Sequence, residues 1–169
     1  MVKPYHILDA LIGLKRVFSS RSGDAKGILL ISAGGLGDTV LFSLFIERLA
    51  SLAKDGEQVT VLLRHDAAKM AFLFPDNVGL EIVNFTQFRK SLSYRRKKAR
   101  KLHKAHYRLV ISTDHLRHPY LDEALVEMAA PEQAFAMAPR SWSKYDAALN
   151  INRRLYDRLF DSGPNQLDK

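Results

Sequence analysis

A glycine-rich segment, SAGGLGDTVL (32–41), contains the first residues whose types could do chemistry. Gly34, Gly35 and Gly37 permit a tight turn and let a ligand approach the backbone closely, although glycines can also simply pack a strand against a helix. Asp38 follows them. It could cap a helix, or it could accept a proton from a hydroxyl nucleophile as a carboxylate in a glycine-walled cleft. The residue types alone leave both interpretations of Asp38 open.

The same segment argues against a dinucleotide site. Val40 stands where the third glycine of the G-x-G-x-x-G pattern belongs. A pyrophosphate at the start of the following helix would also lie beside the carboxylate of Asp38, and two anions at one helix end repel each other. We therefore count Thr39, together with the three glycines, as a candidate to contact a substrate other than a dinucleotide.

Polar residues also follow two other apolar runs, QVTVLLR and YRLVIST. An arginine or histidine there could bind the phosphate or carboxylate of an anionic acceptor, or could be an ordinary solvated loop residue. The D-H-x-x-H pattern after the second run is a weak metal signal with no further ligand evident, so we expect no metal. The substrate-binding candidates at these positions are Arg64, Asp114, Arg117 and His118, with His65 and Lys69 as neighbours of Arg64.

The elements that must position these residues alternate between apolar runs and stretches of helical periodicity. Strands are expected at 27–33, 58–64, 80–85, 107–113 and 134–137. Helices are expected at 38–54, at 66–74, along the basic segment to about 106, and from 119 to about 130. This alternation predicts an α/β fold, a Rossmann-like three-layer parallel sheet. Ligands bind such sheets at the carboxyl ends of the strands, where Asp38, Arg64 and Asp114 fall.

The length of 169 residues suits one such domain, or one lobe of a larger enzyme. We expect an amphipathic N-terminal helix and linker at 1–25, the Rossmann-like domain at 26–140, and a helical tail at 141–169 leading towards an absent second domain. The tail carries an amphipathic stretch between Ile151 and Phe160. A hydrophobic content of 47% excludes a wholly disordered chain.

The chain has no cysteine, which excludes disulfide frameworks, thiolate zinc sites and cysteine nucleophiles and fits a reducing compartment. No apolar run approaches the roughly 20 residues of a membrane-spanning helix, and residues 1–20 lack the pattern of a signal peptide. We therefore expect a cytoplasmic protein.

The net charge of +8 comes from one segment. From Ile82 to Thr113 there is no acidic residue, and ten of the 26 basic residues lie there, which leaves 16 against all 18 acids elsewhere. Such a segment is either a solvated helix face or a surface for anionic lipid headgroups or nucleic acid. Nucleic acid is the less favoured partner, because only Tyr94 and Tyr107 could stack on bases and no RNA- or DNA-binding motif accompanies them. The amphipathic helix at 5–18 would lie in the same membrane interface.

Three stretches resemble glycosyltransferase family 9, the heptosyltransferases of lipopolysaccharide core assembly. GILLISAGGLGDTVLFSLFIERL resembles the first strand, loop and helix of that family, and its Gly-Asp pair is the most specific part. VTVLLRHDAAKMAFLFPDNVGLEIVNF is similar to the second strand, the following helix and the entry to the third strand. YRLVISTDHLRHPYLDEALVEMAAPEQAFAM resembles the fourth strand and its helix, although STDHLRH stands where the family usually has Asp-x-Gln-Gly or similar. The resemblance covers roughly residues 26–160.

The resemblance implies the N-terminal, acceptor-binding half of a GT-B enzyme, in which Asp38 matches the proposed catalytic base. The base would deprotonate a hydroxyl of a lipid-linked glycan acceptor for attack on a nucleotide-sugar, usually ADP-heptose, with inversion and without a metal or other cofactor. The donor would be held by a second domain or a separate donor-domain chain. The protein would be peripheral on the inner face of the cytoplasmic membrane, where the lipid-linked acceptor would lie. Three other classes stay open: a non-catalytic binding module with a degenerate site, a nucleotide-binding Rossmann enzyme, and a basic nucleic-acid-binding protein.

Overall fold

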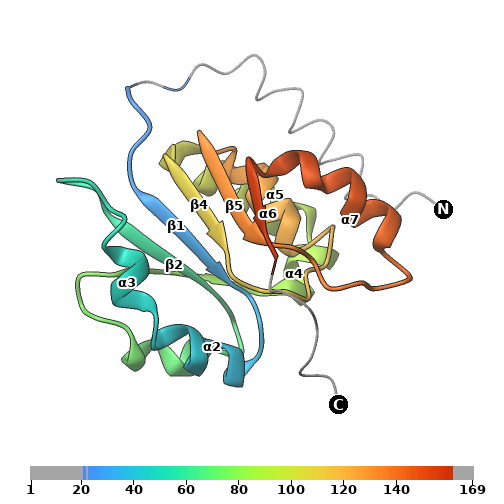
Figure 1. Ribbon diagram of the computed structural model, residues 1–169, viewed down its shortest axis with the longest axis horizontal. Coiled ribbons are helices and arrows are strands. Elements are labelled where there is room, and N and C mark those ends of the chain that lie inside the picture. The colour runs from blue at the N-terminus through green and yellow to red at the C-terminus, as the bar shows by residue number, and fades with distance from the viewer. Residues whose placement is uncertain (1–20, 22, 162–169) are drawn as a thin grey trace.

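The structure is a computed structural model that describes Arg21 and residues 23–161 (Figure 1). The helix expected at 5–18 lies outside the described residues. The strands are β1 (Ile28–Ser32), β2 (Val59–Arg64), β3 (Gly79–Val83), β4 (Leu109–Ser112), β5 (Gln133–Met137) and β6 (Arg158–Phe160). The helices are α2 (Leu36–Ser43), α3 (Ile46–Ala50), α4 (Phe85–Lys90), α5 (Leu92–Ala105), α6 (Asp122–Ala129) and α7 (Asp146–Asn152), with 3-10 turns η1 (Ala68–Leu73) and η2 (Arg153–Leu155).

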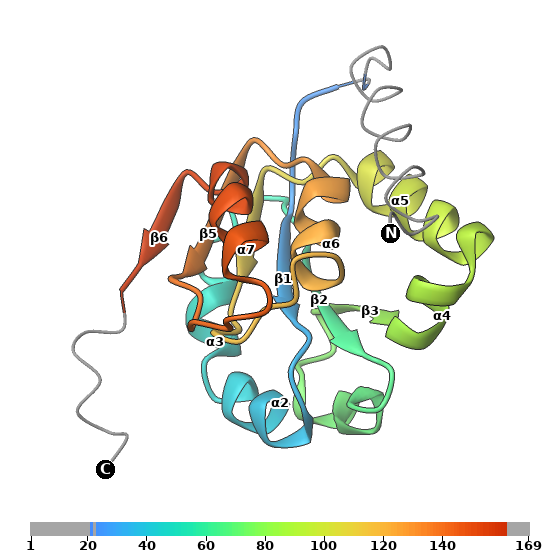
Figure 2. The ribbon, with the colours of Figure 1, turned by 90° about the vertical axis from the view of Figure 1, so that its right-hand side faces the viewer.

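The six strands form one parallel sheet in the order β3-β2-β1-β4-β5-β6. This confirms the predicted α/β, Rossmann-like class. Strand β1 lies at the centre, where Ile28 is paired with Val59 on one side and Leu109 on the other. All five of its residues are buried, which explains why the run is apolar without alternation. In Figure 2, β6 and α4 lie at opposite ends of the molecule, as this order requires.

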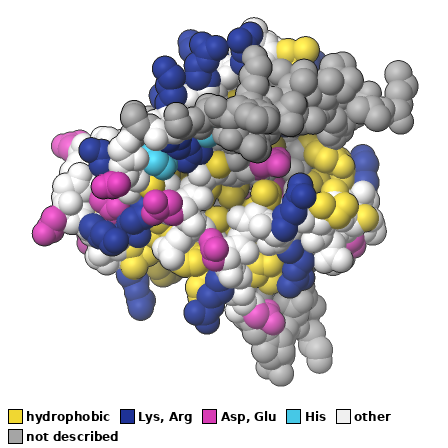
Figure 3. All heavy atoms as spheres, turned by 90° about the horizontal axis from the view of Figure 1, so that it is seen from above, with side chains coloured by type: hydrophobic (Ala, Val, Ile, Leu, Met, Phe, Trp, Pro, Cys, Tyr) yellow, Lys and Arg dark blue, Asp and Glu magenta, His cyan; other side chains and the backbone are white. Residues whose placement is uncertain are grey.

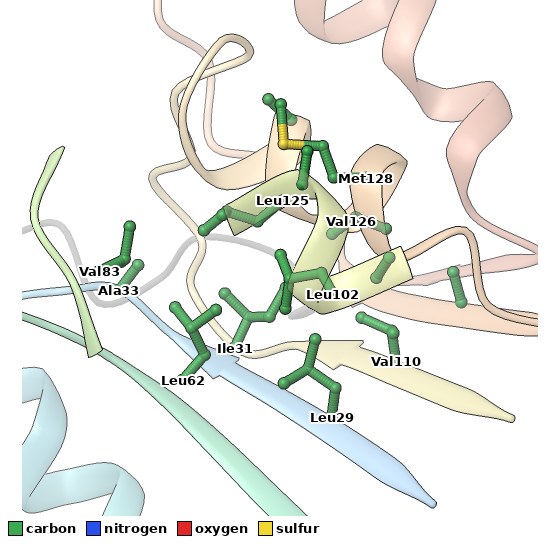
Figure 4. Close-up of a cluster of buried hydrophobic side chains, with 14 of the residues drawn as sticks. Leu29, Ile31, Ala33, Leu62, Val83, Leu102, Val110, Leu125, Val126 and Met128 are labelled. Atoms are coloured by element: carbon green, nitrogen blue, oxygen red, sulfur yellow. The ribbon is translucent and has the colours of Figure 1, made fainter. Parts of the chain in front are cut away.

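Helices cover both faces of the sheet. On one face Leu29 and Ile31 of β1 pack with Leu102 of α5 and with Leu125 of α6 (Figure 4). On the other face the alternate residues of β1, Ile28 and Leu30, pack with side chains of α2 and α3. Figure 1 shows α2 and α3 well apart from α4, α5 and α6, with β1 between them. The period of two along β1 therefore divides the core into two layers.

The single helix expected at 38–54 is wrong: the segment forms two short helices, α2 and α3. Near the end of α2 the Ser43 hydroxyl donates to the Val40 carbonyl oxygen (2.7 Å), and Phe45 N–H donates to the Phe42 carbonyl oxygen (3.0 Å). These bonds span three residues rather than four, and a serine hydroxyl that competes for helix carbonyls bends helices. After the bend, Ile46 packs on the sheet while Phe45 is exposed.

The basic segment is likewise two helices, because Ser91 ends α4 and begins α5. Its hydroxyl oxygen accepts from Tyr94 N–H (3.3 Å), as an N-cap does. Helix α6 begins at Asp122, three residues later than Pro119 suggests. Among the helices of residues 23–161, none is long and apolar enough to cross a membrane.

The exit segment contributes a strand that the sequence did not predict. Its amphipathic pattern suggests a helix, but only its beginning is helical, in α7 and η2, and residues 158–160 form β6 at the edge of the sheet. The side chain of Asp157 accepts from Ala134 N–H (2.8 Å) and Asp157 N–H donates to the Ala134 carbonyl oxygen (2.9 Å). The open edge of β5 thus draws the chain into the sheet, because its backbone groups otherwise lack partners.

Candidate functional site

A cleft of about 840 Å³ opens at the carboxyl edge of the sheet. Its walls are the β1–α2 loop with α2 and α3 on one side, and the segments after β4 and β5 on the other. The cleft lies where the strand order reverses, between β1 and β4, which is the point where parallel α/β sheets bind their ligands. The structure brings five predicted residues to this cleft together with Arg64: Gly34, Gly35, Asp38, Asp114 and His118.

Asp38 lies in the first turn of α2, in an orientation fixed by one hydrogen bond. Gly35, not Asp38, is the N-cap residue, and Asp38 Oδ2 accepts from Gly35 N–H (2.7 Å). The other oxygen, Oδ1, makes no hydrogen bond to a described residue. A Cβ at Gly34 would lie 2.6 Å from Asp38 Oδ2, so only glycine fits there. The carboxylate is therefore oriented through one oxygen and able to accept a proton through the other.

Asp114 closes the same loop from the end of β4. Its Oδ2 accepts from Ala33 N–H (2.7 Å). Burial raises the pKa of Asp114, and the charge of nearby Asp38 acts in the same direction. Carboxylates thus take the N–H of Gly35, the N-cap of α2, and the N–H of Ala33 in the loop before it, so a pyrophosphate at this helix start would lie beside two carboxyl groups. This arrangement disfavours a dinucleotide at the glycine loop.

Asp122, the first residue of α6, is a cleft residue that the sequence reasoning missed. It is 7% exposed, and its Oδ2 accepts from His118 N–H (2.6 Å). Burial raises the pKa of Asp122 to about 7, and the charge of Asp114 adds to this. Acidic residues are common in the first turn of a helix, so the sequence gives no reason to single out Asp122 as a site residue.

His118 has both ring nitrogens engaged. Its Nδ1 accepts from Tyr120 N–H (3.1 Å), so the neutral ring carries its proton on Nε2 and donates it to the Tyr145 hydroxyl (3.1 Å). The ring also packs against Trp142 and Tyr145. His118 therefore anchors an aromatic cluster at the cleft.

Arg117 lies away from the cleft, although it was predicted to bind the substrate. Its side chain is buried, pairs with Glu123 (3.3 Å), and donates to the carbonyl oxygens of Asp114 (2.7 Å) and Met137 (2.8 Å). Arg117 thus ties the β4 loop to α6 and β5. Two arginines that the sequence did not single out, Arg48 and Arg140, line the cleft instead.

The remaining candidates have internal partners or lie outside the cleft. Arg64 lines it, but the guanidinium forms two bonds of 2.6 Å to Asp66. Thr39 is fully buried and its hydroxyl donates to the Gly35 carbonyl oxygen (3.0 Å), so it shapes the loop from behind. Gly37 and Lys69 do not line the cleft, and His65 borders a smaller hollow beside it.

The ten basic residues of 82–113 divide into two groups. Four have internal partners: Arg95 is buried over the Phe88 ring, Lys98 and Lys101 bind Glu81, and Arg108 forms two bonds of 2.6 Å to Glu57. The other six side chains are exposed: Arg89, Lys90, Arg96, Lys97, Arg100 and Lys104. We call the four on α5 (Arg96, Lys97, Arg100 and Lys104) the basic stripe, since their spacing places them on one helix face. Figure 3 shows Lys and Arg side chains gathered along the upper edge of its view.

The described residues contain no group of three or more acidic or histidine side chains that could hold a metal ion. Comparisons of the chain with protein-family models, with curated proteins and with solved structures found no match, so a function can be inferred only from the residues and their geometry.

Proposed function

We propose that the chain is the acceptor-binding half of a glycosyltransferase. The full reaction would move a sugar from a nucleotide-sugar, such as ADP-heptose, to a glycan acceptor of the lipopolysaccharide-core type. The observation that carries the proposal is the placement of Asp38. It stands in a cleft at the switch point of the sheet, with one oxygen held by Gly35 N–H and the other without a partner among the described residues.

Asp38 would act as the general base. Its free oxygen takes the proton of an acceptor hydroxyl, the hydroxyl oxygen forms a bond to the anomeric carbon, and the nucleoside diphosphate leaves with the electron pair of the broken bond. Attack opposite the leaving group inverts the anomeric centre. The neighbouring Asp114 is held by Ala33 N–H and is more buried than Asp38, which is exposed to the cleft, so Asp38 is the better placed of the two to take the proton.

The proposed reaction needs a second domain or chain to hold the nucleotide-sugar donor, and exposed apolar side chains at the cleft offer a surface on which it could dock. Leu41 and Phe45 line the cleft and are 61% and 57% exposed, and Leu44 between them is 74% exposed. The periodicity of the sequence would place these side chains in a core, and exposed apolar patches commonly mark interaction surfaces. We propose that a donor-binding domain, or a separate donor-domain chain, covers them.

The same proposal gives the basic stripe a role. A lipid-linked acceptor lies at an anionic membrane surface, and each Lys or Arg near such a surface contributes about 1 kcal/mol to attraction. The helix that carries the stripe has no acidic residue of its own, because 82–113 contains none. We therefore propose peripheral attachment to the inner face of the cytoplasmic membrane through α5.

Isothermal titration of the chain with two ligands tests the function. We expect a delipidated lipopolysaccharide core oligosaccharide to bind and NAD(H) not to bind, because Asp38 and Asp114 take the N–H groups of Gly35 and Ala33 and stand where a pyrophosphate would lie. In Asp38→Asn the amide oxygen can still accept from Gly35 N–H, so oligosaccharide binding should persist. NAD(H) binding without oligosaccharide binding would replace the proposal with a nucleotide-binding enzyme.

A further inference from the structure

The loop between β5 and α7 forms part of the cleft wall and carries the only tryptophan of the chain, Trp142. The loop is held at both ends. Ala138 N–H donates to the Phe160 carbonyl oxygen (2.7 Å) and Arg140 N–H to the His115 carbonyl oxygen (2.9 Å). Trp142 N–H donates to Asp146 Oδ1 (2.7 Å) in the first turn of α7. These bonds fix the backbone that presents the indole.

The indole side chain is also fixed. Its ring lies nearly at right angles to those of His118 (centroids 5.9 Å apart, 86°) and Tyr145 (4.6 Å, 88°), which is a favoured arrangement of aromatic pairs. Neither neighbour stacks flat on the indole. Within the described residues the indole N–H makes no hydrogen bond, although this group usually finds a partner when it is buried. Trp142 is therefore a rigid, half-buried surface with an unused donor at the cleft.

We propose that Trp142 is a stacking platform for a pyranose ring of the acceptor. One face of many pyranoses carries only C–H groups, which pack on the electron-rich face of an indole. The ring edge carries hydroxyls, which could bond to the indole N–H and to polar side chains such as Asp114. This inference rests on the proposed function, because it names how the same cleft would hold the acceptor whose hydroxyl meets Asp38.

A sugar suits this position better than a nucleotide base, which also stacks on aromatic rings. A base arrives with phosphates, and at the start of α2 the N-cap N–H of Gly35 is occupied by Asp38, while the N–H of Ala33, two residues earlier in the loop, is occupied by Asp114. The carboxyl groups of Asp38, Asp114 and Asp122 line the cleft and can form hydrogen bonds with hydroxyl groups, and in their ionised form they repel phosphates. A sugar has an apolar ring face that can pack on the indole of Trp142 and hydroxyl groups that can bond to the carboxyl groups of the cleft.

Intrinsic fluorescence tests the platform, because Trp142 is the only indole in the chain. We expect a delipidated core oligosaccharide to shift or quench the emission, and tripolyphosphate and ADP not to do so. Tripolyphosphate controls for binding to the basic stripe. By isothermal titration, Trp142→Ala should weaken oligosaccharide binding about tenfold, or about 1.4 kcal/mol. Trp142→Phe, which keeps a flat ring, should bind within about threefold of the wild type.

Phe72→Ala is the matched control, because Phe72 is an aromatic side chain, 77% exposed, that does not line the cleft. Its affinity should equal that of the wild type. If Trp142→Ala binds the oligosaccharide as tightly as the wild type, the platform is wrong while the proposed function stands. If the wild type binds no oligosaccharide, both fail. If ADP changes the emission and the oligosaccharide does not, Trp142 stacks on a nucleotide base and the proposal of a sugar platform is wrong.

Discussion

The cleft and the surroundings of helix α5 both contain several charged side chains, but their carboxylates have different kinds of hydrogen-bond partner. In the cleft, the carboxylates of Asp38, Asp114 and Asp122 accept hydrogen bonds from backbone N–H groups. Around α5, the buried carboxylate of Glu81 is bound by two lysines. A carboxylate bound by a cation is neutralised within the protein. One that is held by a peptide N–H has no cation as its partner and can still accept a proton.

Arginines show the same contrast. Arg117, which does not line the cleft, binds Glu123 and two carbonyl oxygens and is fully buried. On α5, Arg95 is also fully buried, while Arg96 next to it is exposed. The type of residue and its place at a strand end therefore do not decide whether a charge is available to a ligand. The partners that the fold supplies decide it.

The largest effect is expected when the charge pair behind the cleft is broken. Arg117→Ala leaves Glu123 buried without its cation, which typically costs about 3–5 kcal/mol in the free energy of unfolding. Arg64→Ala breaks an exposed pair with Asp66 and should cost at most about 1 kcal/mol. Urea unfolding of the two variants measures the difference.

A second change separates the lost pair from lost packing in this experiment. Adding Glu123→Gln to Arg117→Ala removes the buried charge, so part of the stability should return. If Arg117→Ala alone costs less than about 1 kcal/mol, Arg117 is not part of the internal framework and becomes a candidate ligand residue again.

A smaller, pH-dependent effect is expected at Asp122. Its pKa is raised to about 7 in the folded protein, so the folded state retains a proton that the unfolded state loses near pH 4. Between these values the folded state binds more protons, and the free energy of unfolding must fall as pH rises. Asp122→Asn removes this dependence. At about pH 8 the variant should be more stable than the wild type by roughly 2–4 kcal/mol, from about 1.4 kcal/mol per pKa unit.

Urea unfolding at about pH 5 and about pH 8 measures this, and the difference between variant and wild type should grow with pH. Asp157→Asn is the control, because Asp157 also accepts from a backbone N–H but is exposed at the sheet edge. A constant difference across this pH range would mean that Asp122 is ionised throughout, like an ordinary surface carboxylate.

The architecture could be predicted because it depends on local patterns. The apolar run at 27–33 predicts a buried strand, and the alternation of strands and helices along the chain predicts a parallel sheet. The bend at Ser43 and strand β6 could not be predicted in the same way. The bend depends on one hydroxyl that competes for a helix carbonyl, and β6 depends on the open edge of β5.

The place of the cleft could be predicted from the sequence, but not all of the residues that line it. Asp38 and Asp114 follow strands whose carboxyl ends meet at one edge, so their proximity follows from the fold class. Arg117 follows the same strand, but three residues further on its side chain turns inward to Glu123. Trp142 reaches the cleft from a loop whose course depends on bonds to residues 115, 146 and 160. No spacing in the sequence reveals those bonds.

The smallest effect on stability, with a large effect on binding, is expected at the basic stripe. Replacing its four residues with Gln (Arg96→Gln, Lys97→Gln, Arg100→Gln, Lys104→Gln) should change the free energy of unfolding by at most about 0.5 kcal/mol per site, since all four are exposed. The affinity for vesicles containing anionic lipid should fall on the order of a thousandfold, from about 1 kcal/mol for each charge. Vesicle flotation at about 0.15 M salt measures this.

The control removes the same number of charges elsewhere: Lys26→Gln, Lys54→Gln, Arg153→Gln and Arg154→Gln, all exposed. If the two quadruple variants lose vesicle binding equally, the net charge and not the stripe attracts the membrane. If the wild type binds a short RNA and not the vesicles, the stripe serves nucleic acid. In that case α5 would no longer bring the cleft to a lipid-linked acceptor. The contrast in stability between the buried pairs and the exposed stripe would still hold, since Glu81 and Glu123 would keep their cations.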